Sequence, residues 1–296
     1  MSMKTLALIP VATLFTMSVA PKEAHAISYG TGGWDSENGP DWTIAPTSEQ
    51  TCFLNSIGGA FGGSPGEYTN PSTQAVDSMV SITPFLANGQ SCADDLSAPG
   101  CSWVFQDRNG GGPGIGGGVT CLYGQVTNQC VATWLGVNGQ EGYCPAKSNT
   151  RCFLTAVVTA GELYSGLLNG QQASVTISQP TNGRIYIDGN DADYGNDNSS
   201  ASMVCVDIND LTGSWGFAAT GPASGTTTLQ LRNSYPSGAL VPTANVACGL
   251  TGISGNWMSA PGSLGWNDGV IASAPKGGFW EYDFTNARGG SISCVE

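Results

Sequence analysis

Short runs of alternating apolar and polar residues follow one another along most of the chain, separated by Gly, Asn, Asp and Pro. The clearest run is 173–178, where Val175 and Ile177 would share one face of a strand. Sustained 3.6-residue periodicity, the signature of amphipathic helices, is scarce. The pattern predicts short strands joined by turns, and therefore an all-β protein.

One apolar motif occurs three times, reading TCFLNSI from Thr51, RCFLTAV from Arg151 and ACGLTGI from Ala247. Its cysteines are spaced almost evenly, since 152 − 52 = 100 and 248 − 152 = 96. A spacing of this size is typical of one small repeated domain. After each motif, a second cysteine follows a short β-type run and precedes an aliphatic residue, at Cys121, Cys205 and Cys294 respectively. Each repeat is thus opened and closed by a cysteine.

We therefore predict three tandem disulfide-stapled β-sandwich-like modules, arranged either in line or around a pseudo-threefold axis. Module 1 spans 27–129 with an insertion at about 62–100, module 2 spans 130–210 and includes a Trp-containing linker strand, and module 3 spans 211–296. Trp103, Trp134, Trp215 and Trp280 recur at similar places in the repeats and are predicted to be core residues.

Ten cysteines in an exported chain favour five disulfides over a metal cluster. Each long disulfide loop would stabilise the fold by roughly 4 kcal/mol in the chain-entropy picture. The repeats select three equivalent pairs and leave two short local loops: Cys52–Cys121, Cys152–Cys205, Cys248–Cys294, Cys92–Cys101 and Cys130–Cys144.

The N-terminus has the form of a secretory signal peptide, with Lys4, an apolar run over 6–19 and a cleavage site ending at Ala26. Residues 1–26 are the predicted signal peptide. The apolar run is too short to span a bilayer, and no later stretch is long enough. We expect a secreted, extracellular protein without membrane insertion.

The formal net charge of −13 makes nucleic acid and anionic lipid poor partners, because both would repel the chain. His25 is the only histidine and lies in the predicted signal peptide. A mature chain without histidine has no Ser-His-Asp site, no Cys-His site and no His-ligated zinc. Chemistry run by carboxylates, Lys, Tyr or Arg remains, so enzymatic activity is undecided, with the balance against it.

The stretch 188–198 is the densest in oxygen ligands, and hard cations such as calcium prefer oxygen. Its spacing does not match an EF-hand loop, and Asp, Asn and Gly are also the usual residues of a solvated hairpin turn. No cofactor is required, and calcium is the one candidate. Its possible ligands are Asp188, Asn190, Asp191, Asp193 and Asp197.

Eight tryptophans and nine tyrosines among few charges are typical of a sugar-binding surface, since aromatic faces stack on pyranose rings. The best local candidate for a ligand site comprises Trp257, Trp266, Asn267 and Asp268, in a segment rich in Gly, Ser and Pro. The leading hypothesis is a carbohydrate-binding or adhesive, lectin-like protein whose partner is an extracellular glycan or surface polymer.

Two other hypotheses remain open. A carboxylate-dependent hydrolase of extracellular polymer would need two acids facing one cleft, and no local motif pairs any of Glu67, Asp77, Glu141, Glu162, Asp268 and Glu281. A structural surface or matrix protein would use its repeats for assembly and bind no small ligand.

Overall fold

The protein is described from a computed structural model that covers residues 28–36, 42–59, 78–108, 115–124, 126–135, 141–159, 174–190, 200–209, 211–220, 226–230, 241–242, 244–255, 271–285 and 288–296. The predicted signal peptide lies outside these residues. Within them, no helix has the length and apolar character needed to cross a bilayer.

The described residues form eighteen strands, which confirms the all-β prediction. Alternation in sequence becomes alternation of faces: Ile185 and Ile187 are buried, whereas Arg184 and Asp188 on the same strand are exposed. The strands are β1 (Ser28–Ser36), β2 (Trp42–Pro46), β3 (Gln50–Gly59), β4 (Ser78–Phe85), β5 (Ser102–Arg108), β6 (Ile115–Tyr123), β7 (Val126–Leu135), β8 (Gly142–Pro145), β9 (Thr150–Thr159), β10 (Ser174–Ile177), β11 (Arg184–Asn190), β12 (Ser200–Ile208), β13 (Ser214–Thr220), β14 (Thr226–Gln230), β15 (Ala247–Gly255), β16 (Ile271–Lys276), β17 (Phe279–Thr285) and β18 (Arg288–Val295).

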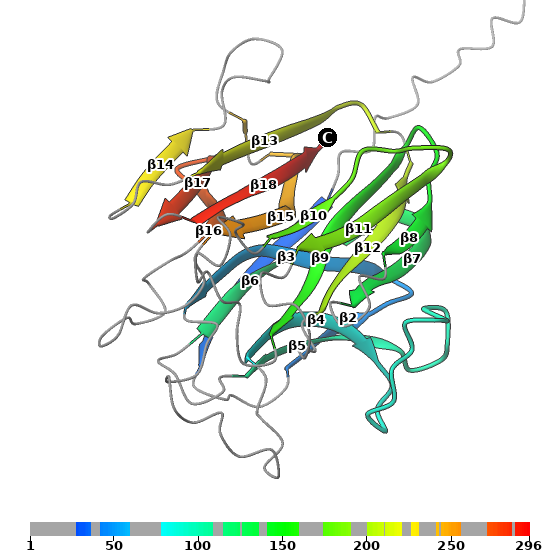
Figure 1. Ribbon diagram of the computed structural model, residues 1–296. Helices are drawn as coiled ribbons and strands as arrows, with labels where there is room; N and C mark the ends of the chain where they lie inside the picture. The colour runs from blue at the N-terminus through cyan, green and yellow to red at the C-terminus, as the bar shows by residue number, and fades with distance from the viewer. Residues whose placement is uncertain are drawn as a thin grey trace, which may run out of the picture.

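The strands form three six-stranded sheets with a cyclic order of pairing (Figure 1). The first sheet has the order β1-β6-β3-β16-β17-β14, the second β7-β12-β9-β4-β5-β2, and the third β13-β18-β15-β10-β11-β8. Each sheet joins three strands of one repeat, which we call its cysteine triplet, to three strands of another repeat, which we call the companion triplet. Every repeat therefore contributes to two sheets.

Both triplets of one repeat also contact each other across the sheets, as in a β-sandwich. In the second repeat, β11 contacts β7 and β12, and the ring of Trp134 lies over Gly189, where an added Cβ would come within 2.6 Å of it. In the first repeat, β4 and β5 contact β6 in the same way. The modules are thus sandwiches that are joined edge to edge.

The edge-to-edge junctions share one register. In each, a β-branched residue five positions after the opening cysteine lies opposite a residue of the companion triplet: Ile57 opposite Ile271, Val157 opposite Val80, and Ile253 opposite Val175. A β-bulge also recurs, because the pairing shifts by one residue at Asn55, Thr155 and Thr251. The three repeats therefore agree in detail as well as in strand order.

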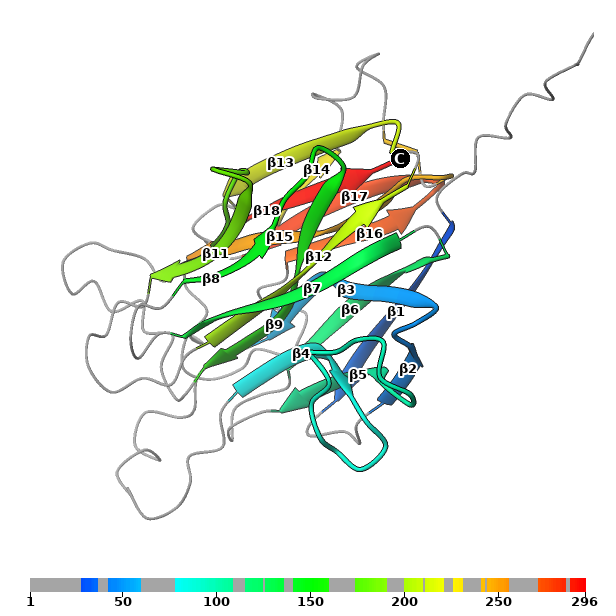
Figure 2. The same ribbon diagram turned by 90° about the vertical axis from the view of Figure 1, so that its right-hand side faces the viewer.

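At the centre, β3, β9 and β15 contact one another (Figure 2). The residue after each opening cysteine lies at this centre. The rings of Phe53 and Phe153 stack with centroids 4.0 Å apart. The third position is Gly249, where an added Cβ would lie 2.4 Å from the Phe53 ring and 2.8 Å from the Phe153 ring. Two rings fill the centre because the third residue has no side chain.

All ten cysteines form disulfides, and the pairs are those that the repeats predict. The three long-range pairs join directly opposed residues of adjacent strands, with Cα–Cα distances of 4.0, 4.0 and 4.1 Å. Cys130–Cys144 links β7 in the second sheet to β8 in the third. Five disulfides indicate folding in an oxidising compartment.

The predicted module limits fall at different places relative to the strands. The first predicted limit, after residue 129, falls inside β7, whereas the second, after residue 210, falls between β12 and β13. Part of the segment predicted as an insertion, β4, is a regular strand that occupies the place of β10 and β16. Among the described residues of that segment, the part without a counterpart strand is the loop closed by Cys92–Cys101.

Candidate functional site

Most residues predicted to bind a ligand or metal lie outside the described residues. Trp257, Trp266, Asn267 and Asp268 fall in 256–270, and Asp191, Asp193 and Asp197 fall in 191–199. Asp188 and Asn190 belong to β11, and the Asp188 side chain is exposed. Within the described part of the chain, no group of three or more His, Cys, Asp or Glu could hold a metal ion.

The four recurring tryptophans lie in or against the core. Trp103, Trp134 and Trp280 are buried, and Trp215 is partly buried. Trp103 and Trp280 make the same bond, each donating its indole N–H to the backbone carbonyl two residues before an opening cysteine, at 2.9 and 2.7 Å. Trp134 and Trp215 differ in register, because Trp215 lies opposite a closing cysteine and Trp134 lies four pairs further on.

The counterpart of Trp103 and Trp280 in the second repeat is Ile185, and a hollow of about 810 Å³ lies beside it. We call it the Arg151 hollow. Residues of β13, β15 and β18, which we call its floor, line it together with Ile185, the start of β9, the chain before β9, and the end of β10 with the turn that follows, which we call its walls. Its volume is within the usual range of small-molecule sites, about 300–1,000 Å³.

Two positions on the floor have smaller side chains than their counterparts in the second repeat. Gly216 and Ser293 face each other on β13 and β18, where the second repeat has Val131 opposite Val204. A Cβ added to Gly216 would have a single neighbour, the Ile292 carbonyl at 4.0 Å. Glycine and serine thus replace two valine side chains and leave a floor rich in hydroxyl groups, since Ser291 and Thr251 also line it.

Arg151 provides the charge of the site. It precedes Cys152, at the position that Thr51 and Ala247 occupy in the other repeats. Its Nε donates to Ser214 Oγ at 2.8 Å, and its Nη1 donates to the carbonyls of Ser148 and Thr150 at 2.9 and 2.7 Å. Burial lowers the pKa of Arg151 below its ordinary value, although an arginine stays charged at neutral pH.

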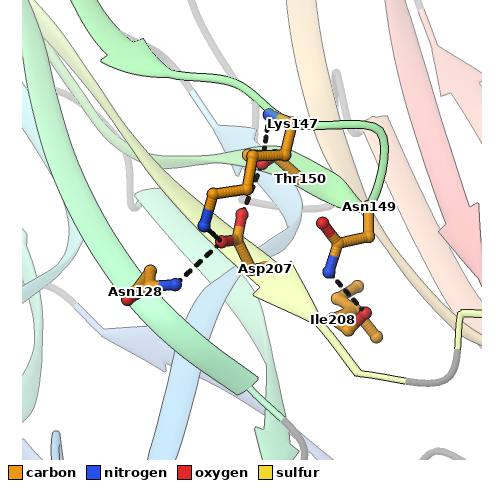
Figure 3. Close-up of polar contacts among 6 residues, drawn as sticks. All are labelled: Asn128, Lys147, Asn149, Thr150, Asp207 and Ile208. Atoms are coloured by element: carbon orange, nitrogen blue, oxygen red, sulfur yellow. Dashed lines mark hydrogen bonds and ion pairs between the residues drawn. The ribbon is translucent and has the colours of Figure 1, made fainter.

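A buried carboxylate, Asp207, holds one wall of the hollow in place (Figure 3). It accepts hydrogen bonds from Lys147 Nζ at 2.6 Å, Asn128 Nδ2 at 2.9 Å and Thr150 Oγ1. Burial alone would raise the pKa of Asp207, but these bonds and the charge of Lys147 hold it below its ordinary value. The neighbouring Asn149 side chain donates to the Ile208 carbonyl at 3.1 Å. The segment 147–150 is therefore tied to β12.

In the third sheet, two tyrosines lie directly opposite each other on β8 and β11. Tyr143 is 47% exposed, and its ring centroid lies 5.8 Å from that of Tyr186. The Arg184 guanidinium lies over the Tyr143 ring, 4.1 Å from its centroid. The tyrosine hydroxyls raise the pKa of Arg184, chiefly through the hydrogen bond with Tyr186. Tyr186 is partly buried, so Tyr143 is the exposed member of this pair.

Two of the carboxylates considered for hydrolysis have described side chains. Glu141, next to β8, is exposed, and Glu281 on β17 is partly buried. Neither lines the Arg151 hollow, whose described lining contains no Asp or Glu. The arrangement is suited to holding a polar ligand by hydroxyl groups and one guanidinium.

No protein-family model matches the chain, and a search of curated proteins finds no significant match.

Reasoning from sequence missed Arg151, Gly216 and Ser293. The signal for Arg151 was present, since it is the single charged residue at a position that is Thr or Ala in the other repeats. Gly216 and Ser293 give no such signal, because Gly and Ser are common throughout the chain and only the register of β13 with β18 places them together.

Proposed function

We propose that this protein is exported and acts as a lectin-like or adhesive protein that binds an extracellular glycan or surface polymer in the Arg151 hollow. One observation carries the proposal: a hollow of about 810 Å³ lined by hydroxyl groups, with apolar surface from Ile177 and Phe217 at its side. Sugars need this combination of polar contacts to hydroxyls and apolar contacts to ring faces.

Export is supported by the signal-peptide pattern of residues 1–26 and by the five disulfides. Catalysis is not part of the proposal, because no pair of carboxylates lines the described hollow.

The test is binding of the purified mature protein to a panel of extracellular oligosaccharides and insoluble polysaccharides, with reducing ends measured in parallel. We expect binding without release of reducing ends. Gly216→Val rebuilds the valine of the second repeat over the floor of the hollow and should abolish binding. The control is Thr176→Val, which adds valine at an exposed position of the same sheet outside the hollow and should bind normally.

Released reducing ends would show a hydrolase instead. Binding that survives Gly216→Val would place the ligand elsewhere on the chain. No binding, together with concentration-dependent assembly in sedimentation velocity, would favour the structural alternative.

A further inference from the structure

The Arg151 hollow is positively charged in a strongly acidic protein. The chain has 9 Lys and Arg against 22 Asp and Glu, yet the described lining holds Lys147 and Arg151 and no carboxylate. Lys147 is already paired with Asp207. Arg151 forms no ion pair within the described residues, so its charge is the one in the hollow that is left without a compensating acid.

The guanidinium of Arg151 is held in a fixed orientation with donors to spare. Its Nε and Nη1 groups are engaged by Ser214, Ser148 and Thr150, all neutral partners. Among the described residues, the two N–H groups of Nη2 have no hydrogen-bond partner, and each can donate a charge-assisted hydrogen bond to a carboxylate. Because three hydrogen bonds already fix the Arg151 side chain, less of its conformational entropy is lost when a ligand binds.

Partial desolvation favours an anion at this place. A half-buried cation with only neutral partners has lost hydration without gaining an opposite charge. A ligand carboxylate would compensate for the lost hydration, because charges in this site are only partly screened.

We infer that the ligand of the Arg151 hollow is an acidic saccharide, whose carboxylate binds Arg151 while its hydroxyls bind Ser291, Ser293 and Thr251. This inference rests on the proposed lectin-like function and specifies the class of sugar. Neutral glycans lack the group that Arg151 recognises.

The experiment is isothermal titration calorimetry of the mature protein with oligogalacturonate and sialyllactose, each compared with its own methyl ester. Esterification removes the charge of the carboxylate and keeps the sugar, so this comparison is independent of protein folding. We expect at least one acid to bind about tenfold or more tightly than its ester, with affinity that falls as salt rises.

Two variants locate the effect. Arg151→Gln should lose the preference for the acid over the ester, and Arg151→Lys, which keeps the charge without the oriented Nη2 donors, should retain part of it. Arg184→Gln is the matched control, since it removes the same charge from an exposed arginine outside the lining and should bind as the unaltered protein does. Thermal melting of each variant verifies that it is folded.

Equal affinity for acid and ester, or a preference that persists in Arg151→Gln, would overturn the inference and leave the lectin-like function standing. A failure of all acidic and neutral saccharides to bind would overturn both.

Discussion

At the centre of the core, Gly249 leaves no space for a side chain. A methyl group there would collide with both central phenylalanine rings, which are themselves fully buried. We predict that Gly249→Ala lowers the free energy of unfolding by about 1–3 kcal/mol, as overpacking usually does. Guanidinium denaturation followed by tryptophan fluorescence measures it.

The matched control is Gly216→Ala on the floor of the Arg151 hollow, where the new methyl group meets a single atom at 4.0 Å. Its stability should change by less than about 0.5 kcal/mol. Equal effects of both substitutions would contradict the packing described for the centre.

Asp207 should make stability depend on pH. Its pKa is lower in the folded protein than in the unfolded chain, so its contribution is present above the unfolded pKa and is lost as pH falls through the folded pKa. We predict that Asp207→Asn costs about 1.5–3 kcal/mol at pH 7, the usual range for hydrogen bonds to a charged group. In urea unfolding, the difference from the unaltered protein should shrink below about pH 4.

Asp95→Asn, in an exposed turn where Asp95 binds Ser97, is the control and should show no comparable loss at any pH. A penalty for Asp207→Asn that stays constant from pH 7 to pH 3 would argue against a charged Asp207.

At the scale of elements, the disulfides should differ in their contribution to stability. Cys152–Cys205 closes a separation of 53 residues, and Cys92–Cys101 closes one of 9. Loop-closure entropy predicts that replacing the first pair by alanines costs at least about 1.5 kcal/mol more than replacing the second. Equilibrium unfolding of the two double variants tests this order, and an equal or reversed order would contradict it.

Much of the element level could be predicted from sequence. The repeated motifs placed the opening and closing strands and selected all five disulfide pairs, because paired cysteines in equivalent repeats leave few alternatives. The companion triplets were harder. At each junction an ordinary β-branched residue pairs with the companion triplet, as Val157 does with Val80. Nothing in the local sequence indicates which repeat supplies the partner strand. The Arg151 hollow could not be predicted for the same reason, since Gly216 and Ser293, which lack large side chains, lie on two strands that are far apart in the sequence.

At the scale of the whole molecule, the cyclic pairing should make unfolding cooperative. Every sheet contains strands of two repeats, so the loss of any one repeat would leave two sheets with exposed edges. We predict a single calorimetric transition whose measured enthalpy equals the van't Hoff enthalpy. Three separable transitions would mean that the modules are independent, contrary to the pairing.

The pairing scheme is one that three identical subunits could also adopt, and the consequence of having a single chain lies in valency. Identical subunits would place the same residue at all three equivalent positions, so a guanidinium beside the opening cysteine would occur three times. In this chain it occurs once, at Arg151, while the other positions hold Thr51 and Ala247. Under the proposed function, a site that depends on this guanidinium is monovalent, and firm attachment to the proposed polymer would require several protein molecules acting together rather than avidity within one.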